Sequence, residues 1–365
     1  MPEPITGGAG PEGRGRTLAQ AYRRFGEARS AGKSPLDAHV ALALAGSDAA
    51  LRALEAVPAR QRRPALVLAV LHDLALAGRA AALGAAYAAA DAAAAAEAAV
   101  DTVLRMSGTV ADVAVRRRLR TYDTTSCLVL HPAVAEAAHR AGAGVVGLVD
   151  LGDAATHNLQ VDRVGIACSD GQFRGDTSSP VQLSATVVGS RPLPARTLPV
   201  VVARVALGTD LVDVTAPDDA RWLRACLSPD QPEQLSTLET ALALAATTPP
   251  LLLRGDGVEE LPTALARVPA GALPVVTTTW TLSSWKPEAR LRFLHRLQEA
   301  AAGRTVAWVS VEGVGVAPSV PTLGDRRASG HSLIALALLD GSGPHADVLG
   351  RCWSRGRLLS WLADG

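Results

Sequence analysis

Two different hydrophobic patterns divide the chain. Over residues 17–120, alanine, leucine, arginine and glutamate dominate and strand-like alternation is absent, which predicts helices throughout. Prolines and glycines separate five or six such helices, and Ser34-Pro35 places a capping residue and a proline at one predicted helix start. From Ala143 onward, short apolar runs alternate with helical segments. The chain therefore predicts an all-α N-terminal cap domain followed by an α/β domain over residues 121–365.

The second pattern contains five apolar, β-branched runs typical of buried parallel strands. They cover residues 145–151, 200–207, 250–256, 274–280 and 305–312. Helices are predicted over residues 217–246, with a break at 228–230, and over 258–268 and 287–302.

Two further features complete the predicted sheet. Residues 163–200 are rich in Ser, Thr, Gly and Val and predict a β-hairpin insertion. Residues 332–339 and 358–362 predict two last strands with no helix between them. The fold class expected is therefore α/β, a Rossmann-like, mostly parallel sheet of the class I methyltransferase type with an antiparallel C-terminal hairpin.

Composition excludes several classes of protein. The chain has 365 residues, 48% of them hydrophobic, and a formal net charge of +1, so a sizeable core is expected and a nucleic-acid partner is not. The cysteines lie far apart without a C-x-x-C motif, which argues against a zinc site or a disulfide framework. No metal cluster is expected.

The two ends of the helical region bear on localisation. Residues 1–16 lack an apolar segment and predict a disordered tail without a signal peptide. The Ala-rich run 80–100 contains Asp91 and Glu97, which favours a packed helix over a membrane span. We expect a cytoplasmic protein with a small-molecule substrate and no membrane partner, and a homodimer is left open.

The end of the first strand is the most informative segment. Val145-Val-Gly-Leu-Val-Asp150-Leu-Gly152-Asp153 passes from an apolar run to an acid, a glycine and a second acid. Parallel strands deliver their carboxyl ends to ligands in this way, although the later glycines of G-x-G-x-x-G are missing. Asp153 would repel a phosphate, whereas it suits a sulfonium or ammonium cation.

One sequence block links the chain to a family. Arg221-Trp-Leu-Arg224-Ala-Cys-Leu-Ser-Pro229-Asp230-Gln231 is close to the RWLRA-x-x-x-PDQ block of the bacterial family DUF2332. Further matches are Arg60-Gln-Arg-Arg-Pro64 with His72, Gly208-Thr-Asp210, Gly255-Asp256, Trp308-Val-Ser-Val-Glu312 and Gly356-Arg-Leu-Leu-Ser-Trp361. The chain resembles this family from Tyr22 to the C-terminus. The resemblance implies a methyltransferase-like domain behind a helical N-terminus, and so a fold more than a reaction.

The resemblance also implies a cofactor, S-adenosylmethionine, across the carboxyl ends of the first strands. The residues expected around its methionine part are Asp150, Gly152, Asp153 and Asn158. Asp210 is the ribose candidate and Asp256 the adenine candidate. Each also has a structural alternative, Asp210 as a carboxylate in a strand-end turn and Asp256 as the cap of the next helix.

The chain departs from the family at three places. Thr121-Tyr122-Asp123-Thr124-Thr125-Ser126 stands where the family has T-N-E-x-G-R, and Gly152-Asp153-Ala-Ala-Thr-His157-Asn158-Leu stands for G-A-S-A-G-L-N-L. Arg355-Gly356 replaces a late His-Gly. Tyr122, Asp123 and His157 are the catalytic candidates, although His157 also fits a structural histidine. The same changes favour an altered or lost activity.

Two further sets are candidates for substrate binding. Arg221 and Arg224 share a helix face and could hold a carboxylate, or else pair with neighbouring acids on a helix docked by Trp222. Thr279 and Trp280 end the fourth strand, where methyltransferases orient the acceptor, although the threonine run also fits β propensity. Glu312, at the end of the fifth strand, is a further candidate.

These residues lead to three expected functions. The first is an S-adenosylmethionine-dependent transferase of the methyltransferase type, acting on a small molecule under a helical lid. Aminocarboxypropyl transfer or cyclisation on the same cofactor is an alternative. A non-catalytic methyltransferase-like partner or structural protein is another, favoured by the altered turns.

Overall fold

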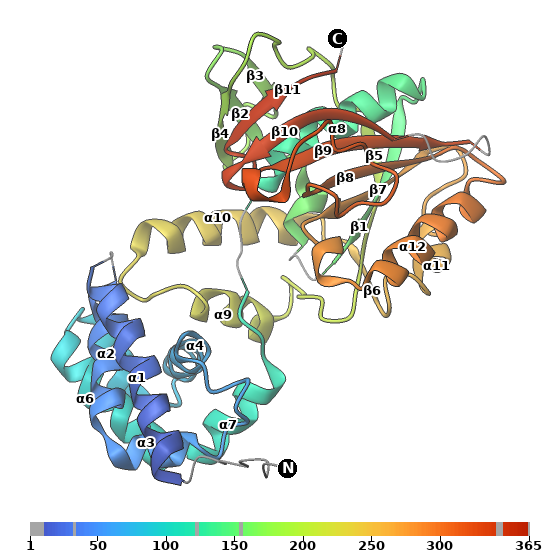
Figure 1. Cartoon of the computed structure of the whole chain (residues 1–365). Coiled ribbons are helices and arrows are strands. Elements are labelled where there is room, and N and C mark those ends of the chain that lie inside the picture. Colours follow the sequence, from blue (N-terminus) through green and yellow to red (C-terminus); the bar gives the residue numbers. More distant parts are fainter. Residues whose placement is uncertain (1–10, 32–33, 121–123, 153–155, 341–345, 364–365) are drawn as a thin grey trace, which may run out of the picture. The chain divides into compact units, whose positions relative to one another are not determined.

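The computed structural model describes residues 11–31, 34–120, 124–152, 156–340 and 346–363. Over these residues the fold is mixed α/β, with twelve α-helices and one large, mostly parallel sheet of eleven strands (Figure 1). They form two compact units. The first comprises residues up to 121 together with Pro217–Leu238, and the second comprises residues 122–216 and 239–365.

The first unit is built from helices. They are α1 (Pro11–Ser30), α2 (Pro35–Gly46), α3 (Asp48–Leu54), α4 (Pro64–Leu76), α5 (Ala81–Ala88), α6 (Ala92–Arg105), α7 (Ser107–Arg116), α9 (Pro217–Ala225) and the start of α10 (Pro232–Thr247). The sequence predicted five or six helices over residues 17–120, whereas seven lie within residues 11–116. Residues 11–16, predicted as part of a disordered tail, belong to α1.

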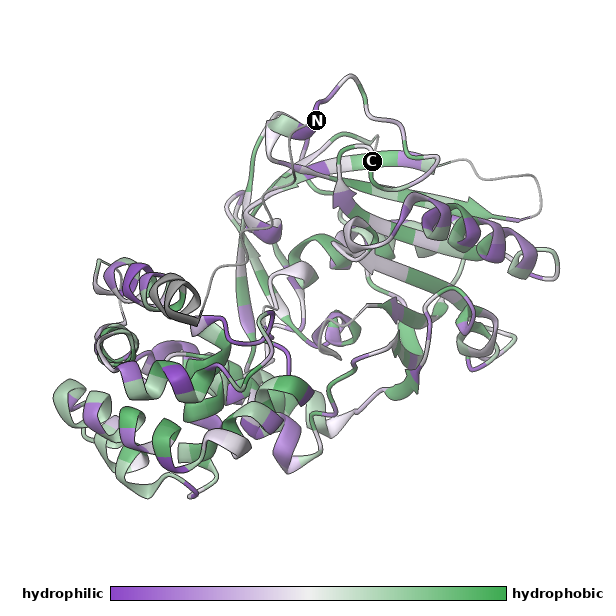
Figure 2. Ribbon diagram, turned by 60° about the horizontal axis from the view of Figure 1, so that its bottom comes forward, coloured by the Kyte–Doolittle hydropathy of each residue, from purple (hydrophilic) through white to green (hydrophobic). Residues whose placement is uncertain are grey.

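Burial explains why these helices pack together. Helix α4 is buried along nearly its whole length, from Leu66 to Leu74, so it forms the centre of this unit. In the other helices, hydrophobic residues alternate with hydrophilic ones along the sequence (Figure 2), and the hydrophobic residues pack into the shared core. Ser47 caps α3 by accepting a hydrogen bond from the backbone N–H of Ala50 at 3.2 Å.

The second unit contains the sheet. Its strands are β1 (Val145–Leu151), β2 (Gly165–Cys168), β3 (Phe173–Gly175), β4 (Gln182–Val187), β5 (Val200–Gly208), β6 (Leu251–Arg254), β7 (Leu273–Thr279), β8 (Val306–Gly313), β9 (Ser332–Leu339), β10 (Ala346–Trp353) and β11 (Leu358–Trp361). Their order across the sheet is β3-β2-β4-β11-β10-β9-β8-β7-β1-β5-β6.

One half of the sheet is parallel. Strands β6, β5, β1, β7 and β8 are neighbours in that order, and every pair is parallel. The chain runs from β1 outward to β5 and β6, and then returns to β7 and β8 on the other side of β1. The direction of winding therefore switches between β1 and β7, and ligands of doubly wound sheets bind at such a point.

The other half corrects the predicted C-terminal hairpin. Strands β8, β9, β10 and β11 form an antiparallel series, and β11 continues into β4, β2 and β3, so this series is not the edge of the sheet. Strand β10 was not predicted. A register shift between Val348 and Gly350 breaks its two-residue alternation, which removes the pattern on which a strand prediction depends.

Helices cover both faces of the sheet. Helix α8 (Ser126–Arg140) and the end of α10 pack in one core with β1, β7 and β8, while α11 (Leu261–Leu265) and α12 (Pro287–Ala300) pack on the opposite face (Figure 1). The sequence analysis assigned no element to α8. Residues Ser126 to Ala138 are all buried, so the helix lacks the polar face that reveals most surface helices.

Candidate functional site

A buried carboxyl group lies at the switch point of the sheet. Asp150, at the carboxyl end of β1, is only 2% exposed and stands opposite Thr277 of β7. The Thr277 hydroxyl donates a hydrogen bond to its Oδ1 at 2.6 Å. The Asn158 amide donates to both carboxylate oxygens, at 3.1 and 3.2 Å. Asp150 and Asn158, both predicted from the first turn, are thus in direct contact.

The environment of Asp150 is electrostatically unusual. Burial raises its pKa to about 7, and the hydrogen bonds from Thr277 and Asn158 lower that pKa only in part. Both donors are neutral, and within the described parts of the chain no cation faces the carboxyl group. A titratable group perturbed in this way at a ligand-binding edge is typical of functional sites.

The network extends to the start of helix α8. The Asn158 Oδ1 accepts a hydrogen bond from the hydroxyl of Ser126, and its Nδ2 lies 3.5 Å from the Thr279 hydroxyl. Asn158 itself belongs to the 3-10 helix η1 (Thr156–Gln160). Four separate segments therefore meet in one buried polar cluster. Sequence reasoning missed Ser126, although it lies in the segment that departs from the family.

Gly152 is needed for close packing within the protein. Its φ of +128° favours glycine, and a Cβ atom there would clash with the Thr281 hydroxyl. That hydroxyl donates a hydrogen bond to the Leu151 carbonyl at 2.9 Å. The Thr281 side chain therefore fills the space on one side of Gly152. From the sequence, Gly152 was expected to let a cofactor approach the backbone.

The loops after β5 and β6 start beside this turn. The Gly152 N–H donates to the Leu207 carbonyl at 3.0 Å, and the Gly255 N–H donates to the Gly208 carbonyl at 3.1 Å. Asp210 is half-buried and follows β5, and Asp256 is exposed and follows β6.

Asp256 has a local structural role. Its Oδ1 accepts hydrogen bonds from the backbone N–H groups of Val258 at 2.8 Å and Glu259 at 3.2 Å. Asp256 therefore caps the turn that precedes α11, which is the structural alternative considered from the sequence. Its second carboxylate oxygen makes neither of these two bonds.

Glu312 ends β8 on the opposite face of the sheet from Asp150. It is 1% exposed, and its Oε1 accepts hydrogen bonds from the N–H groups of Thr281 and Leu282, each at 2.9 Å. It therefore orders the turn that carries Trp280 and Thr281. Its Oε2 is buried and has no hydrogen-bond partner in the described structure, and burial raises its pKa to about 7.

Trp280 follows β7 in a strained conformation. Its φ is +52°, which is uncommon for a bulky residue. Its N–H donates to the Val311 carbonyl at 2.9 Å, and its indole Nε1 donates to the Ser332 hydroxyl at 2.8 Å. Both ends of the residue are therefore fixed beside the polar cluster, next to the buried Thr279.

The two predicted substrate-binding arginines lie in the helical unit. Arg221 and Arg224 lie in α9, which belongs to the helical unit and not to the sheet unit. Arg221 pairs with Asp73 at 2.9 Å and with Asp218 at 2.7 Å. Arg224 is half-buried in the same helix. The second interpretation from the sequence, arginines that pair with neighbouring acids, describes Arg221.

The sequence block around these arginines helps to hold the helical unit together. Trp222 is 1% exposed, and its Nε1 donates to the Arg118 carbonyl at 2.8 Å. Asp230 accepts a hydrogen bond from the Leu36 N–H at 2.8 Å, and the Gln231 amide donates to the Ser34 hydroxyl at 2.9 Å. These contacts explain why residues 217–238 join the first unit.

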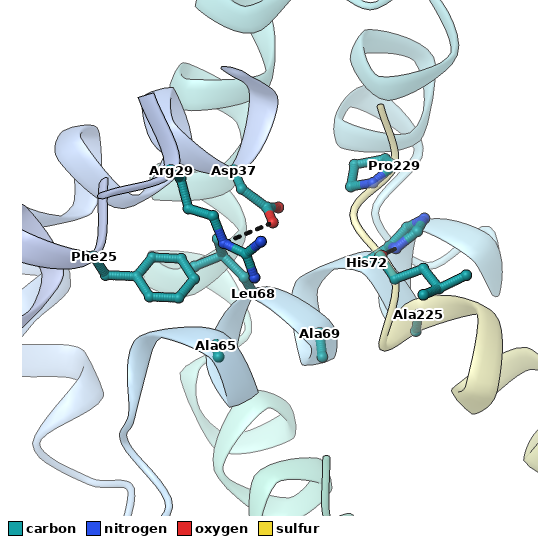
Figure 3. A pocket seen from close by; sticks show the side chains of 10 residues that line it. Phe25, Arg29, Asp37, Ala65, Leu68, Ala69, His72, Ala225 and Pro229 are labelled. Atoms are coloured by element: carbon teal, nitrogen blue, oxygen red, sulfur yellow. Dashed lines mark hydrogen bonds and ion pairs between the residues drawn. The ribbon is translucent and has the colours of Figure 1, made fainter. Parts of the chain in front are cut away.

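A small pocket lies in the helical unit (Figure 3). Asp37 lines it and is 3.9 Å from Arg29, while His72 contacts the Leu227 carbonyl through Nδ1 at 3.0 Å. Burial raises the pKa of Asp37 and lowers the pKa of His72. The pocket has room for about one water molecule, so it does not suit an organic ligand.

The remaining candidates are placed as follows. Tyr122, Asp123 and Asp153 lie outside the described residues. His157 is 5% exposed, and its carbonyl accepts a hydrogen bond from the Cys127 thiol at 3.5 Å. Within the described ranges, no group of three His, Cys, Asp or Glu side chains is arranged to hold a metal ion.

The length and hydropathy of the described helices bear on whether any of them could span a membrane. No single helix among them is long and apolar enough to cross a membrane. Helices α4 and α5 together meet the length and composition criterion, but they are bent by 96° to each other.

The geometry defines the class of this molecule as an α/β protein with a helical unit and a polar cluster at the switch point of a partly parallel sheet. A family model described as "Uncharacterized protein conserved in bacteria (DUF2332)" matches residues 19–361. The chain therefore belongs to the DUF2332 family, which confirms the family predicted from the sequence block. No curated protein matches the sequence.

Proposed function

We propose that the protein is an S-adenosylmethionine-dependent transferase of the methyltransferase type that acts on a small molecule. The observation that carries this proposal is Asp150, a buried carboxyl group at the switch point that receives only neutral hydrogen bonds. The parallel order β6-β5-β1-β7-β8 supports it, because ligands of such sheets bind at the carboxyl ends of the strands.

The sheet supports the methyltransferase type in a second respect. An antiparallel strand, β9, follows the last parallel strand, as the strand pattern of the sequence predicts for this type of sheet. The antiparallel part is longer here than a single hairpin, since it continues through β10 and β11. The proposal therefore takes the parallel half as the cofactor-binding part of the sheet.

The charge of the site favours a cationic ligand. A positive charge near Asp150 would lower the pKa of its carboxyl group and hold it ionised, whereas a phosphate would raise that pKa further. The sulfonium and ammonium groups of S-adenosylmethionine are both cations. The negative charge of Asp150, when ionised, therefore suits S-adenosylmethionine better than it suits a nucleotide with phosphate groups.

The residues have distinct proposed roles. Asp150 and Asn158 would hold the methionine part of the cofactor beside the turn at Gly152. Asp153 is proposed to contact the same part of the cofactor. Asp210 would bind the ribose, and the second carboxylate oxygen of Asp256 would bind the adenine. When bound, the cofactor supplies an electrophilic carbon on its sulfonium.

The remaining work of the chain is positioning. Ser126, Thr277 and Thr279 fix the cluster, so the ligand would meet preorganised groups. The proposal keeps Tyr122, Asp123 and His157 as the groups that would move a proton if the acceptor must lose one.

Calorimetric titration of the purified protein with S-adenosylmethionine and S-adenosylhomocysteine tests the proposal. We expect saturable binding of both, weakened at least about tenfold by Asp150→Asn. Thr278→Val is the matched control, because Thr278 lies on the other face and accepts a hydrogen bond from Trp308 at 3.0 Å. Its affinity should stay within about twofold of the wild type.

The pH dependence sharpens this test. Because Asp150 must be ionised to attract a cation, binding of S-adenosylmethionine should strengthen as the pH rises from about 6 to about 8. Absence of binding to either nucleoside at millimolar concentration would reject the proposal. Release of S-adenosylhomocysteine from a turnover assay indicates methyl transfer, and release of methylthioadenosine indicates aminocarboxypropyl transfer or cyclisation.

One observation favours the non-catalytic alternative. Thr281 fills the space beside Gly152, where a cofactor would otherwise approach the backbone. If the turn is closed to ligands, the protein keeps the fold as a partner or structural protein. The same titration separates the two functions, since only the enzyme binds the nucleosides.

A further inference from the structure

A strained turn connects β10 to β11. Ser354, Arg355 and Gly356 form the 3-10 segment η4 and have φ values of +47°, +55° and +94°. Two of them carry side chains, and each left-handed residue of that kind costs about 1 kcal/mol or more. Such strain persists only where the surrounding structure imposes it, and it is concentrated at functional sites.

The turn is packed against the start of helix α8 at Gly356. A Cβ atom on Gly356 would lie 2.9 Å from the Thr125 carbonyl and 3.1 Å from Val129. The turn therefore sits directly on the first turn of α8. Ser126, the first residue of α8, belongs to the polar cluster around Asp150.

The turn places Arg355 on a second strained residue. The Arg355 guanidinium carbon lies 5.5 Å from the centre of the Trp280 ring, which is within the range of cation–π contacts. Trp280 also has a positive φ and is held by Val311 and Ser332. Two strained residues from distant parts of the chain thus hold one stacked pair at the carboxyl end of β7.

Among the described residues, Trp280 is the one side chain that contacts the Arg355 guanidinium through its charge. Arg355 is exposed, and within the described structure no hydrogen bond or ion pair engages it. Two other basic side chains differ in this respect, since Arg351 and His331 both contact Asp325, at 2.6 and 2.9 Å. The arginine is therefore held in place without being neutralised.

We propose that Arg355 and Trp280 bind an anionic group, a carboxylate or a phosphate monoester, on a planar acceptor substrate. A guanidinium presents paired N–H donors that match either anion, and the half-buried indole against which it lies offers an aromatic surface next to the bound anion. That the bound molecule is the acceptor of a transfer reaction rests on the proposed function. That the site binds an anion rests only on the contact between Arg355 and Trp280.

Ligand-observed NMR and calorimetry with benzoate, phenyl phosphate and neutral benzyl alcohol test this site. We expect benzoate or phenyl phosphate to bind and benzyl alcohol to bind at least about tenfold more weakly. Arg355→Asn is the informative variant, because asparagine tolerates the left-handed backbone. It should weaken binding of the anion at least about tenfold.

Arg357→Asn is the matched control, since Arg357 is an exposed arginine two residues away. It should leave affinity within about twofold of the wild type. Trp280→Phe should weaken both aromatic anions more than it weakens acetate or inorganic phosphate. The preferred anion, carboxylate or phosphate, identifies the substrate class.

Two results would overturn the inference. One is no binding of either aromatic anion at about 10 mM, and the other is equal binding by the Arg355→Asn and wild-type proteins. Titration of the same samples with S-adenosylhomocysteine keeps the two proposals apart. Nucleoside binding without anion binding rejects only the anion site, and Arg355-dependent anion binding without nucleoside binding rejects only the cofactor.

Discussion

Replacement of Asp150 by asparagine should stabilise the protein relative to the wild type at alkaline pH, and this gain in the free energy of unfolding should disappear at acidic pH. The side chain is 2% exposed and its pKa is raised from 3.8 to about 7 by burial. Folding must therefore ionise this group in a buried environment whenever the pH exceeds that value. Asparagine has nearly the same shape and removes the charge.

The magnitude follows from linkage. The folded protein binds the proton of the Asp150 carboxyl group more tightly than the unfolded chain does. Protonation of Asp150 therefore stabilises the folded protein fully below about pH 4, and this stabilisation is lost as the pH rises to about 7. Each unit corresponds to about 1.4 kcal/mol, which gives a loss of about 4 kcal/mol in all. Between about pH 5 and pH 8 the loss is about 3 kcal/mol.

Urea unfolding measures this difference. The free energy of unfolding of Asp150→Asn minus that of the wild type should increase by about 3 kcal/mol between about pH 5 and pH 8. Taking the difference cancels other groups, including Glu312, whose pKa is also raised to about 7. At low pH the variant should be slightly less stable, because an amide faces the Asn158 donor.

A difference that does not change between these pH values would refute the reasoning, since it would mean that Asp150 ionises as easily in the folded as in the unfolded protein. Thr278→Val serves as the control. Its hydroxyl faces Trp308 on the other side of the sheet, so its stability difference should be independent of pH.

Three further substitutions test the packing. Gly152→Ala should lower the free energy of unfolding by about 3 kcal/mol, because it combines a φ of +128° with a clash against Thr281. Trp222→Phe should cost about 2 kcal/mol in thermal unfolding, through lost volume and a lost indole hydrogen bond. Arg204→Met should cost about 2 kcal/mol in urea unfolding, since it leaves the partly buried Asp162, bound at 2.6 and 2.7 Å, without its cation.

Each of these tests has its own control. Gly144→Ala introduces a Cβ with no atom within 4 Å and should be nearly neutral, so an equal cost for both glycines would contradict the proposed clash. A Trp222→Phe variant as stable as the wild type would mean that Trp222 does not anchor α9. Adding Asp162→Asn to Arg204→Met should recover part of the loss, and a further loss would argue against an unpaired charge as its cause.

The parallel strands were predictable because of what parallel sheets require. Strands β1, β7 and β8 are buried on both faces, so they stand out as mostly apolar runs in the sequence, and β5 is similarly apolar although its first half is partly exposed. The polar residues that end such runs then mark the carboxyl edge. This reasoning led to Asp150 and Asn158, and the structure brings them into contact.

Other features have no local signal. Helix α8 is buried all round and contains Pro132, so it has neither a polar face nor an uninterrupted helical sequence. The register shift in β10 conceals that strand. The contact between Ser126 and Asn158 joins residues 32 positions apart, and no periodicity predicts such a pair.

The sequence by itself determined the family, the mixed α/β class and the polar turn after the first strand, since all of these depend on local order and composition. Only the tertiary structure decided where Arg221 belongs and what fills the space at Gly152. Arg221 pairs with Asp73, 148 positions away, and Thr281 approaches Gly152 from another strand end. Such partners are chosen by how the elements pack, and packing is a property of the whole chain rather than of any one segment.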